Sequence, residues 1–409
     1  MRSEWQTREL GEVAELHDSL HRTPAYAEDG YPMIRVTDIR RGYVNTEGAM
    51  RVDYSTFLEF SQKHRAMRGD ILFSRVGSYG NSAYVIKDEE LCLGQNTVCI
   101  STDRSVVDPF FLYSTLNSDT VRHQVQALVG GASQGTISLK SIRRILIPMP
   151  PLTLQRRIAG ILSAYDDLIE NNQRRIKILE EMARSLYREW FVKFHFPGHE
   201  KAKMVPSRLG PIPQGWEVNK LKDVCHLTMG QSPKSEFYND TGEGQPFHQG
   251  VTNFGDRFPM DRLFCTVEGR LAEAGDILFS VRAPVGRMNI ADKKIIIGRG
   301  LSAIRHKDGH QAFLWEQLRN RFTKDDMMGN GAIFAAVTKN DMQGIEIVCP
   351  PEPIVREVTN HFSPLHTQTA TLSEQTSNLR RTRDLLLPRL ISGKARVETV
   401  DTLARRVNH

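Results

Sequence analysis

The chain has 409 residues, which is more than one core's worth, and 40% of them are hydrophobic, enough to fill two or three cores. Neither an apolar run of about 18 residues nor a signal peptide is found, since the chain opens MRSEWQTREL, so we expect a cytoplasmic protein without a membrane span. The net charge of +6 permits a nucleic-acid partner without requiring one, because a uniformly basic surface gives the same total.

The cysteines show no CxxC pair and no neighbouring histidine ladder, so they are interpreted as buried thiols and no metal site is predicted. His195 and His199 have a metal-like spacing, but they lie in FHFPGHEK, which resembles a linker. The five cysteines are Cys92, Cys99, Cys225, Cys265 and Cys349.

Residues 1–150 form the first predicted domain, of mixed α+β type. Short apolar or alternating runs bounded by Gly, Asp and Asn predict strands, and the apolar spacing of residues 108–128 predicts a helix. The predicted strands cover residues 33–36, 71–74, 83–86, 97–100 and 145–147.

Residues 151–195 carry an apolar seam with alternating steps of four and three residues, which predicts one long helix with a heptad repeat. Asn172 is a polar residue of the kind that sets register in such a seam. Ser163 is a candidate cap, and Asp166, Asp167 and Glu170 are interpreted, with Arg174 and Arg175, as a solvated, salt-bridged face. The seam consists of Ile158, Leu162, Tyr165, Ile169, Asn172, Ile176, Leu179, Ala183, Leu186 and Trp190.

Residues 196–215 contain four prolines and predict a partly extended linker. Residues 216–350 then repeat the first domain. The phrase GDILFS occurs at 69–74 and again at 275–280, and Trp5, Leu10 and Val13 match Trp216, Leu221 and Val224. Anchors in a kept order with a drifting offset predict a tandem duplication of one domain followed by one long helix.

Residues 351–392 carry the same ladder in degraded form, before a tail at 393–409. Pro364 disfavours a helix interior, so the second long helix is predicted to begin there after a shorter one. Two ladders in one chain favour an antiparallel internal pair, although pairing between two chains is the alternative. The second ladder consists of Val358, Phe362, Leu365, Thr369, Leu372, Thr376, Leu379, Arg383, Leu386 and Leu390.

Three segments together resemble the specificity subunits of type I restriction-modification enzymes. They are the helical PPLTLQRRIAGILSAYDDLIENNQRRIKILEEMARSLYREWFVKF, the tail LLLPRLISGKARV and the linker phrase LGPIPQGWEV. With the duplicated GDILFS, the resemblance covers nearly the whole chain. The chain departs from the family pattern in the second seam, which is weakened by Pro353, Pro364, Thr369, Thr376 and Arg383.

The resemblance implies a non-catalytic subunit with two α/β target recognition domains separated by two long antiparallel coiled-coil helices. Each domain would read one half of a bipartite, asymmetric double-stranded DNA target. The helices would set the spacer and dock two methyltransferase subunits, and restriction subunits would add cleavage. The methyl donor, ATP and Mg²⁺ would bind those partners, so no cofactor is expected on this chain.

The residues themselves show no phosphate loop, no HExxH, no GxSxG and no methylation motif, so the chain is predicted to read DNA rather than to react with it. Loops after the strands concentrate Arg, Asn, Gln and Ser, which suit phosphates and base edges. Ordinary turn chemistry would give the same composition. The candidates in the first domain are Arg35, Thr37, Asp38, Arg75, Ser78, Tyr79, Asn81, Gln95, Asn96, Ser133, Gln134, Thr136 and Lys140.

The loops of the second domain carry different polar residues after similar strands, which predicts two unlike half-sites. Arg75 and Arg282 are predicted to act separately, each on one half-site. A stand-alone enzyme of unrecognised motif and a structural coiled-coil adaptor are the competing hypotheses. The candidates in the second domain are Lys234, Gln249, Thr252, Asn253, Arg282, Arg287, Arg299, Phe334 and Lys339.

Overall fold

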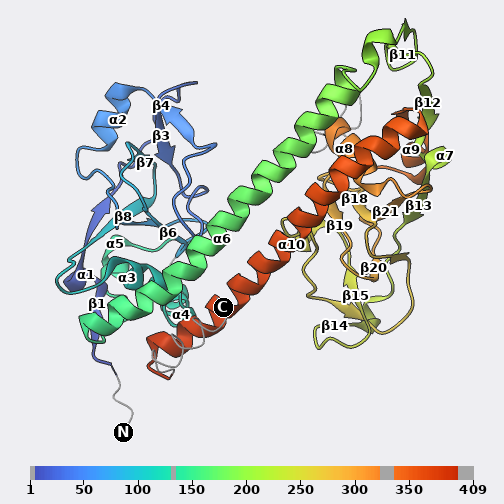
Figure 1. Cartoon of the computed structure of the whole chain (residues 1–409). Helices are drawn as coiled ribbons and strands as arrows, with labels where there is room; N and C mark the ends of the chain where they lie inside the picture. The colour runs from blue at the N-terminus through green and yellow to red at the C-terminus, as the bar shows by residue number, and fades with distance from the viewer. Residues whose placement is uncertain (1–4, 130–134, 323–335, 395–409) are drawn as a thin grey trace. The chain divides into compact units, whose positions relative to one another are not determined.

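The computed structural model describes residues 5–129, 135–322 and 336–394, and the chain divides into two compact units (Figure 1). Unit 1 comprises Met1–Glu170 with Ser377–His409, and unit 2 comprises Asn171–Thr376. Each long helix therefore contributes one part to each unit. This division differs from the consecutive segments predicted from the sequence, because a helix that packs on two domains belongs to neither alone.

Unit 1 is built on a four-stranded antiparallel sheet in the order β2-β8-β5-β6. A second sheet, β4-β3-β7, pairs β3 antiparallel to β4 and parallel to β7, and β1 pairs with β9. The strands are β1 (Thr7–Glu9), β2 (Ala14–Asp18), β3 (Tyr31–Ile34), β4 (Met50–Val52), β5 (Ile71–Ser74), β6 (Ser82–Tyr84), β7 (Cys92–Leu93), β8 (Thr97–Thr102) and β9 (Leu146–Pro148).

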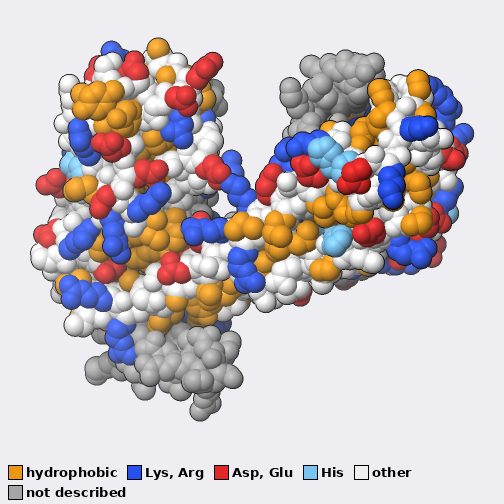
Figure 2. Space-filling model, turned by 45° about the horizontal axis from the view of Figure 1, so that its top comes forward, with side chains coloured by type: hydrophobic (Ala, Val, Ile, Leu, Met, Phe, Trp, Pro, Cys, Tyr) orange, Lys and Arg blue, Asp and Glu red, His pale blue; other side chains and the backbone are white. Residues whose placement is uncertain are grey.

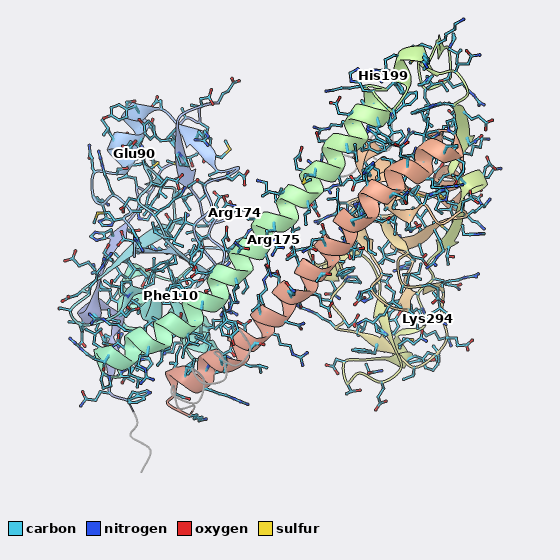
Figure 3. The ribbon with its side chains drawn as sticks, viewed as in Figure 1. Glu90, Phe110, Arg174, Arg175, His199 and Lys294 are labelled. Carbon is cyan, nitrogen blue, oxygen red and sulfur yellow. The ribbon has the colours of Figure 1, made fainter. Side chains whose placement is uncertain are left out.

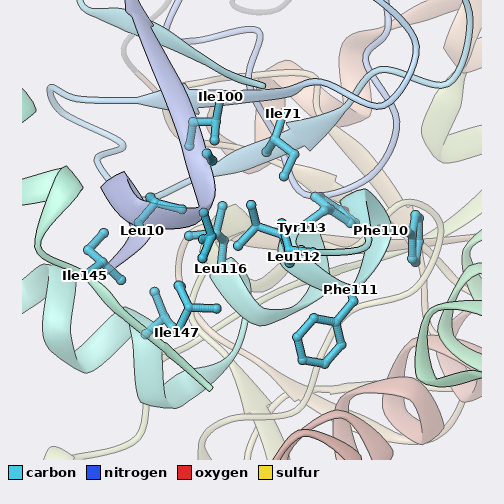
Figure 4. Packing of buried hydrophobic residues seen from close by; sticks show 14 of the residues in the cluster. Leu10, Ile71, Ile100, Phe110, Phe111, Leu112, Tyr113, Leu116, Ile145 and Ile147 are labelled. Atoms are coloured by element: carbon cyan, nitrogen blue, oxygen red, sulfur yellow. The ribbon is translucent and has the colours of Figure 1, made fainter. Parts of the chain in front are cut away.

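The central strand β5 is buried on both faces, which explains its continuous apolar run. Ile71 and Phe73 pack into the largest core with Leu10 and Ile100, shown in Figure 4, whereas Leu72 packs into a second core on the opposite face. The glycine before the strand, Gly69, has a φ of +100°, a conformation that favours glycine over other residues. The repeated GDILFS therefore combines one turn requirement with one doubly buried strand.

The short helices of unit 1 pack against its two larger sheets. The helix predicted over 108–128 is two helices, because Asn117 bonds back to the Tyr113 carbonyl and the Ser118 hydroxyl caps the next helix by accepting from the Val121 N–H. The helices are α1 (Leu10–Val13), α2 (Tyr54–Phe60), α3 (Pro109–Leu116), α4 (Asp119–Leu128) and α5 (Leu139–Arg143).

Unit 2 repeats the topology of unit 1, which confirms the predicted duplication. The sheet β13-β21-β18-β19 matches β2-β8-β5-β6, and the parallel pair β15 and β20 matches β3 and β7. The strands are β12 (Glu217–Lys220), β13 (Cys225–Met229), β14 (Tyr238–Asn239), β15 (Gln245–His248), β16 (Phe264–Cys265), β17 (Leu271–Ala272), β18 (Ile277–Ser280), β19 (Met288–Ile290), β20 (Ile295–Ile297), β21 (Leu301–His306) and β22 (Glu346–Cys349).

Unit 2 also contains, within its described residues, the short helices α7 (Leu221–Val224), α8 (Gln311–Arg321) and α9 (Lys339–Gly344), together with the segment predicted as a linker. That segment contains a short hairpin of β10 (Met204–Val205) and β11 (Ile212–Pro213). Phe196, Ile212 and Trp216 are buried with the end of the first long helix. The linker is therefore partly extended, as predicted, and it is also packed.

The two long helices are α6 (Leu152–Tyr187), continued by a π-helical turn at Arg188–Val192, and α10 (Glu352–Ile391). In unit 1, Ile158 and Leu162 from the start of α6 share a core with Leu387 and Leu390 from the end of α10. In unit 2, Ala183 and Tyr187 from the end of α6 pack with Val358 and Phe362 from the start of α10. These contacts confirm the predicted antiparallel internal pair and the predicted fold class.

The seam residues are inward as predicted: none of the ten positions on either ladder is exposed. Ile158, Leu162, Ile169, Asn172 and Ala183 are buried on α6, and the others are half-buried. On α10, buried Thr369 and Thr376 each donate a hydroxyl bond to the carbonyl four residues earlier, at 2.8 and 2.7 Å. No helix in the described ranges is long and apolar enough to cross a membrane.

Two predicted helix limits are wrong. The second long helix begins at Glu352 and passes through Pro364, because Ser363 and Pro364 lie on its exposed face, where solvent can bond the carbonyl that proline leaves without a donor. Ser163 is not a cap, because α6 begins eleven residues earlier, at Leu152. The Ser163 hydroxyl donates to the Gly160 carbonyl inside the helix.

The interpretation of Asp166 as part of a solvated face is also wrong. Asp166 is buried on α6 and forms an ion pair with Arg383 of α10, whose side chain is only 9% exposed. Tyr43 donates a 2.5 Å bond to the neighbouring Asp167. Arg383 therefore does not weaken the seam, because it pairs with the buried charge of Asp166. Arg174 and Arg175 are exposed, as expected (Figure 3).

Candidate nucleic-acid interface

The predicted loops of unit 1 converge at one end of the sheet, where hydrogen bonds to main-chain carbonyls join them. The Arg75 N–H donates to the Asn96 carbonyl and the Ile137 N–H donates to the Arg75 carbonyl, both at 3.0 Å. The Ser78 hydroxyl donates to the Val36 carbonyl at 3.1 Å. The segments 35–38, 75–81, 95–96 and 136–140 therefore form one surface, called loop set 1.

The candidate residues of loop set 1 differ in exposure. Thr37, Ser78, Gln95, Thr136 and Lys140 are exposed, whereas Arg35, Asp38, Arg75, Tyr79, Asn81 and Asn96 are half-buried. Asn96 has a φ of +64°, a left-handed conformation that asparagine tolerates. Ser133 and Gln134 lie outside the described residues.

Arg75 has an anchoring role that the sequence did not predict. Its Nη1 donates to Asp18 Oδ1 at 2.8 Å and its Nε donates to the Ile137 carbonyl at 3.2 Å, while its side chain is 13% exposed. Both bonds engage donors that a base edge would need. Arg75 therefore holds the loops in place, and it presents little of its guanidinium to a duplex.

Arg75 and Arg282 are not equivalent positions, although they were predicted as a pair. Arg75 directly follows GDILFS in unit 1, and the residue in that place in unit 2 is the buried Val281. Arg282 lies one residue further on and matches Val76, because the bridge Val76 to Thr136 recurs as Arg282 to Ala336. The arginine of unit 1 is thus part of the framework, and the arginine of unit 2 is exposed.

Arg35 and Asp38 bind each other within their own turn. Arg35 donates its backbone N–H to Asp38 Oδ2 at 3.0 Å and its Nε to the same oxygen at 3.1 Å. This hydrogen bond raises the pKa of Arg35 and keeps its guanidinium close to the turn. Because a single ion pair at a partly exposed position is weak, a phosphate or a base can compete for it.

The predicted loops of unit 2 converge in the same way. The Val281 N–H donates to the Gly300 carbonyl at 3.0 Å, and the Val337 N–H donates to the Val281 carbonyl at 2.8 Å. The Ser232 hydroxyl donates to Gln249 Oε1 at 2.8 Å and accepts from the Arg299 N–H at 3.2 Å. The segments 231–234, 248–253, 282–287, 299 and 336–339 form this second surface, called loop set 2.

Loop set 2 presents more positive charge than loop set 1. Its exposed cations stand on four different segments, whereas Lys140 is the exposed cation among the described candidates of loop set 1. Gln249 and Thr252 are exposed, Asn253 is half-buried, and Phe334 lies outside the described residues. The exposed cations of loop set 2 are Lys234, Arg282, Arg287, Arg299 and Lys339.

Comparison with known proteins decides the family. The model of the type I restriction modification DNA specificity domain matches residues 2–181 and again 213–379, which is most of the chain and both copies of the repeat. The chain belongs to this family. The predicted resemblance is therefore confirmed.

Relatives of this specificity family match along the whole chain. The MjaX specificity subunit of Methanocaldococcus jannaschii, assigned to a type I restriction enzyme, is 30% identical over 97% of this chain and 95% of its own length. The HindI specificity subunit of Haemophilus influenzae is 23% identical over 96% of this chain and 100% of its own. The crystal structure of the type I restriction-modification S subunit from M. genitalium shares the fold, with a TM-score of 0.57, 16% identity and coverage of 95% and 97%.

Sequence reasoning missed one candidate, Arg270, which adjoins loop set 2. Arg270 lines a hollow of about 320 Å³ together with Gln231 and Ser232 of the loop set, and it is exposed. Its segment precedes β17, and no motif marks it. The pairing of β17 with β20 brings Arg270 to this place, and the Ile297 N–H donates to the Arg270 carbonyl at 2.8 Å.

Basic side chains do not gather into one patch on the face drawn in Figure 2, where Lys and Arg alternate with Asp and Glu in each unit. The charged side chains visible on this face are therefore mixed in sign. In the two loop sets, donors and acceptors stand on segments that hydrogen bonds hold together.

Proposed function

We propose that this chain is the non-catalytic DNA-specificity subunit of a type I restriction-modification complex, in which each loop set reads one half of a bipartite, asymmetric double-stranded DNA target. The observation that carries the proposal is the pair of loop sets, built on the same main-chain framework but with different side chains. An equal framework gives both surfaces the same approach to a duplex. Different side chains give each a different donor and acceptor pattern.

The loop sets supply the chemistry that reading requires. Exposed Gln95 and Gln249 carry amides that can bond an adenine edge in two places, and exposed Arg282 and Arg299 suit guanine or phosphate. In loop set 2 the additional cations Lys234 and Lys339 would add phosphate contacts. Salt should therefore weaken binding through unit 2 more steeply than through unit 1.

We further propose that methyltransferase subunits dock on the helices, and that α6 and α10 set the spacer between the half-sites. The paired helices support this, because a packed antiparallel pair resists bending more than a single helix does. Two methyltransferase subunits, and in a cleaving complex two restriction subunits, would complete the assembly. Those subunits would hold the methyl donor, ATP and Mg²⁺.

The test is the methylation pattern of a complex reconstituted with its methyltransferase subunit. Randomised DNA is methylated by the wild type, by Gln95→Ala and by Arg299→Ala, and modified sites are read by single-molecule sequencing. Gln95→Ala should relax one half-site and Arg299→Ala the other. Each lost bidentate contact should reduce discrimination at one base by about 1–3 kcal/mol.

A matched control is Lys294→Ala, which removes an exposed cation of unit 2 between β19 and β20 (Figure 3). It should leave both half-sites and the spacer unchanged. Equal relaxation of both half-sites by either loop variant would contradict separate reading. Methylation of DNA by the purified chain alone would contradict the non-catalytic role.

A further inference from the structure

Three side chains with different ligand chemistry meet beside β5 in unit 1. The Nε2 atom of His64 lies 2.7 Å from Asp70 Oδ2, and the Sγ atom of Cys99 lies 3.5 Å from the same oxygen. All three ligand atoms lie within 4.8 Å of one another. Within residues 5–129, 135–322 and 336–394, this is the group of His, Cys, Asp and Glu side chains close enough to share a metal ion.

The cluster is enclosed and its ligands are held in place. The side chains of His64 and Asp70 are 14% and 9% exposed, and Cys99 is fully buried. Ser101 donates its hydroxyl to Asp70 Oδ1 at 2.8 Å, and the His17 ring stacks on the His64 ring with centroids 4.0 Å apart. Such outer contacts orient ligands in metal sites, since they set the direction of the carboxylate and of the imidazole plane.

The second copy of the domain shows what this position requires. Asp276 matches Asp70 in the repeat, and Arg305 donates to its Oδ1 at 2.6 Å. In the strand register Arg305 matches Ser101 and Ala303 matches Cys99. Unit 2 thus gives the buried carboxylate a permanent cation, whereas unit 1 has a serine there and adds a thiol and an imidazole.

We propose that His64, Asp70 and Cys99 bind one divalent cation of the zinc type. One thiolate, one carboxylate and a divalent cation sum to zero charge, as do Asp276 and Arg305 in the second copy, and a neutral sum suits a buried place. Neighbouring ligand atoms of a tetrahedral zinc lie about 3.3–3.6 Å apart, given bonds of about 2.0–2.3 Å. The Cys99 to Asp70 separation already has this value, and that of His64 to Asp70 must widen by about 0.6 Å.

Binding transfers the Cys99 proton to solvent as the sulfur–metal bond forms. Burial, reinforced by Asp70, raises the pKa of the Cys99 thiol well above its usual value, so without a cation the thiol stays protonated. The ion would join the segment after α2 to strands β5 and β8. This inference assigns Cys99 a ligand role that its isolated position in the sequence did not predict, and it does not depend on the proposed function.

The test uses the full chain, stripped of metal with a chelator and titrated with Co²⁺, which gives visible absorption in a tetrahedral site and a thiolate charge-transfer band in the near ultraviolet. We expect uptake of one Co²⁺ per chain with both bands, and their loss when Zn²⁺ is added. Cys99→Ala should lose the thiolate band, and His64→Gln should weaken uptake at least tenfold. Cys92→Ala removes another buried thiol of the same unit and should change neither band.

Two results would overturn the inference: no thiolate band in the wild type, or a band that persists in Cys99→Ala. The second copy carries Ala303 at the matching position, so the alanine variant is expected to fold, and far-ultraviolet circular dichroism checks this. Native mass spectrometry of the wild type with Zn²⁺ decides independently of any variant. A chain that gains one zinc supports the site, and a chain that gains none refutes it.

Discussion

The buried ion pair between Asp166 and Arg383 joins the two long helices within unit 1. Its burial determines how much free energy of unfolding is lost when one partner is removed. The side chains are 6% and 9% exposed, so solvent screens them little. Removing one partner of a buried pair costs about 3–5 kcal/mol, because the other charge is left without compensation. Replacing both by apolar residues is close to neutral.

The neighbours of the pair make its two ends unequal. Burial, and then repulsion by Arg383, lowers the pKa of Arg41, which also lies near Asp166. After Arg383→Met, Arg41 remains to offset part of the charge of Asp166, so we expect a loss of about 3 kcal/mol. After Asp166→Asn, Arg383 keeps its 3.1 Å bond to Asp384, so we expect about 1–2 kcal/mol.

The assay is urea unfolding followed by circular dichroism and by tryptophan fluorescence. Three of the four tryptophans, Trp190, Trp216 and Trp315, lie in unit 2, so fluorescence reports mainly on that unit. Arg383→Met should shift the circular dichroism midpoint and leave the fluorescence midpoint nearly unchanged, and exposed Arg381→Met is the control. A loss below about 0.5 kcal/mol in Arg383→Met would refute the reasoning. It would also be refuted if the double variant Arg383→Met with Asp166→Leu lost the sum of the two single losses.

Three further predictions concern single positions. Arg75→Ala should lower both the melting temperature and the affinity for DNA, since it loses two hydrogen bonds worth about 1.5–3 kcal/mol together. Arg282→Ala should lower only the affinity for DNA, measured by gel shift. Equal losses of melting temperature in the two variants would contradict the anchoring role. Pro364→Ala should stabilise the chain by about 1–2 kcal/mol in urea unfolding, and no gain would indicate that α10 is broken there. Burial and the nearby His310 lower the pKa of His306, whose neutral ring accepts the Asp308 N–H. The neutral ring therefore stabilises unit 2 above pH 6.5, and this contribution is lost as the pH falls through the lowered pKa. His306→Gln should flatten the dependence of stability on pH between pH 7 and 5, and an unchanged slope would contradict this.

Much of the architecture was predictable because it rests on patterns local in the sequence. The four-three spacing from Ile158 to Trp190 requires only that one helix face avoid water, and the repeat of GDILFS requires only a glycine turn and a doubly buried strand. Pro364 misled the prediction because a local rule was applied without knowing which face the proline occupies. Its exposed position, not its identity, decides the outcome.

The site was less predictable because its contacts join distant residues. Asp166 and Arg383 are 217 residues apart, so the acidic cluster around Asp166 resembled an ordinary helical surface. The partner of Arg75 is Asp18, at the end of another strand, and no spacing rule connects them. The inequality of Arg75 and Arg282 was visible in the sequence, since Arg282 is one residue further from GDILFS, but a shared residue type concealed it.

The bonds that hold the loop sets explain how one fold can serve two different targets. In both units the residue after GDILFS donates to the segment before the neighbouring sheet strand, β8 or β21, and accepts from the segment before a short helix, entirely through main-chain atoms. Any side chain except proline can make such bonds, so exposed positions such as Gln95 and Arg299 are free to differ without changing the loop geometry. Arg75 departs from this rule by anchoring through its side chain. It follows that exchanging exposed loop residues between the units should transfer base preference, whereas moving Arg75 should not.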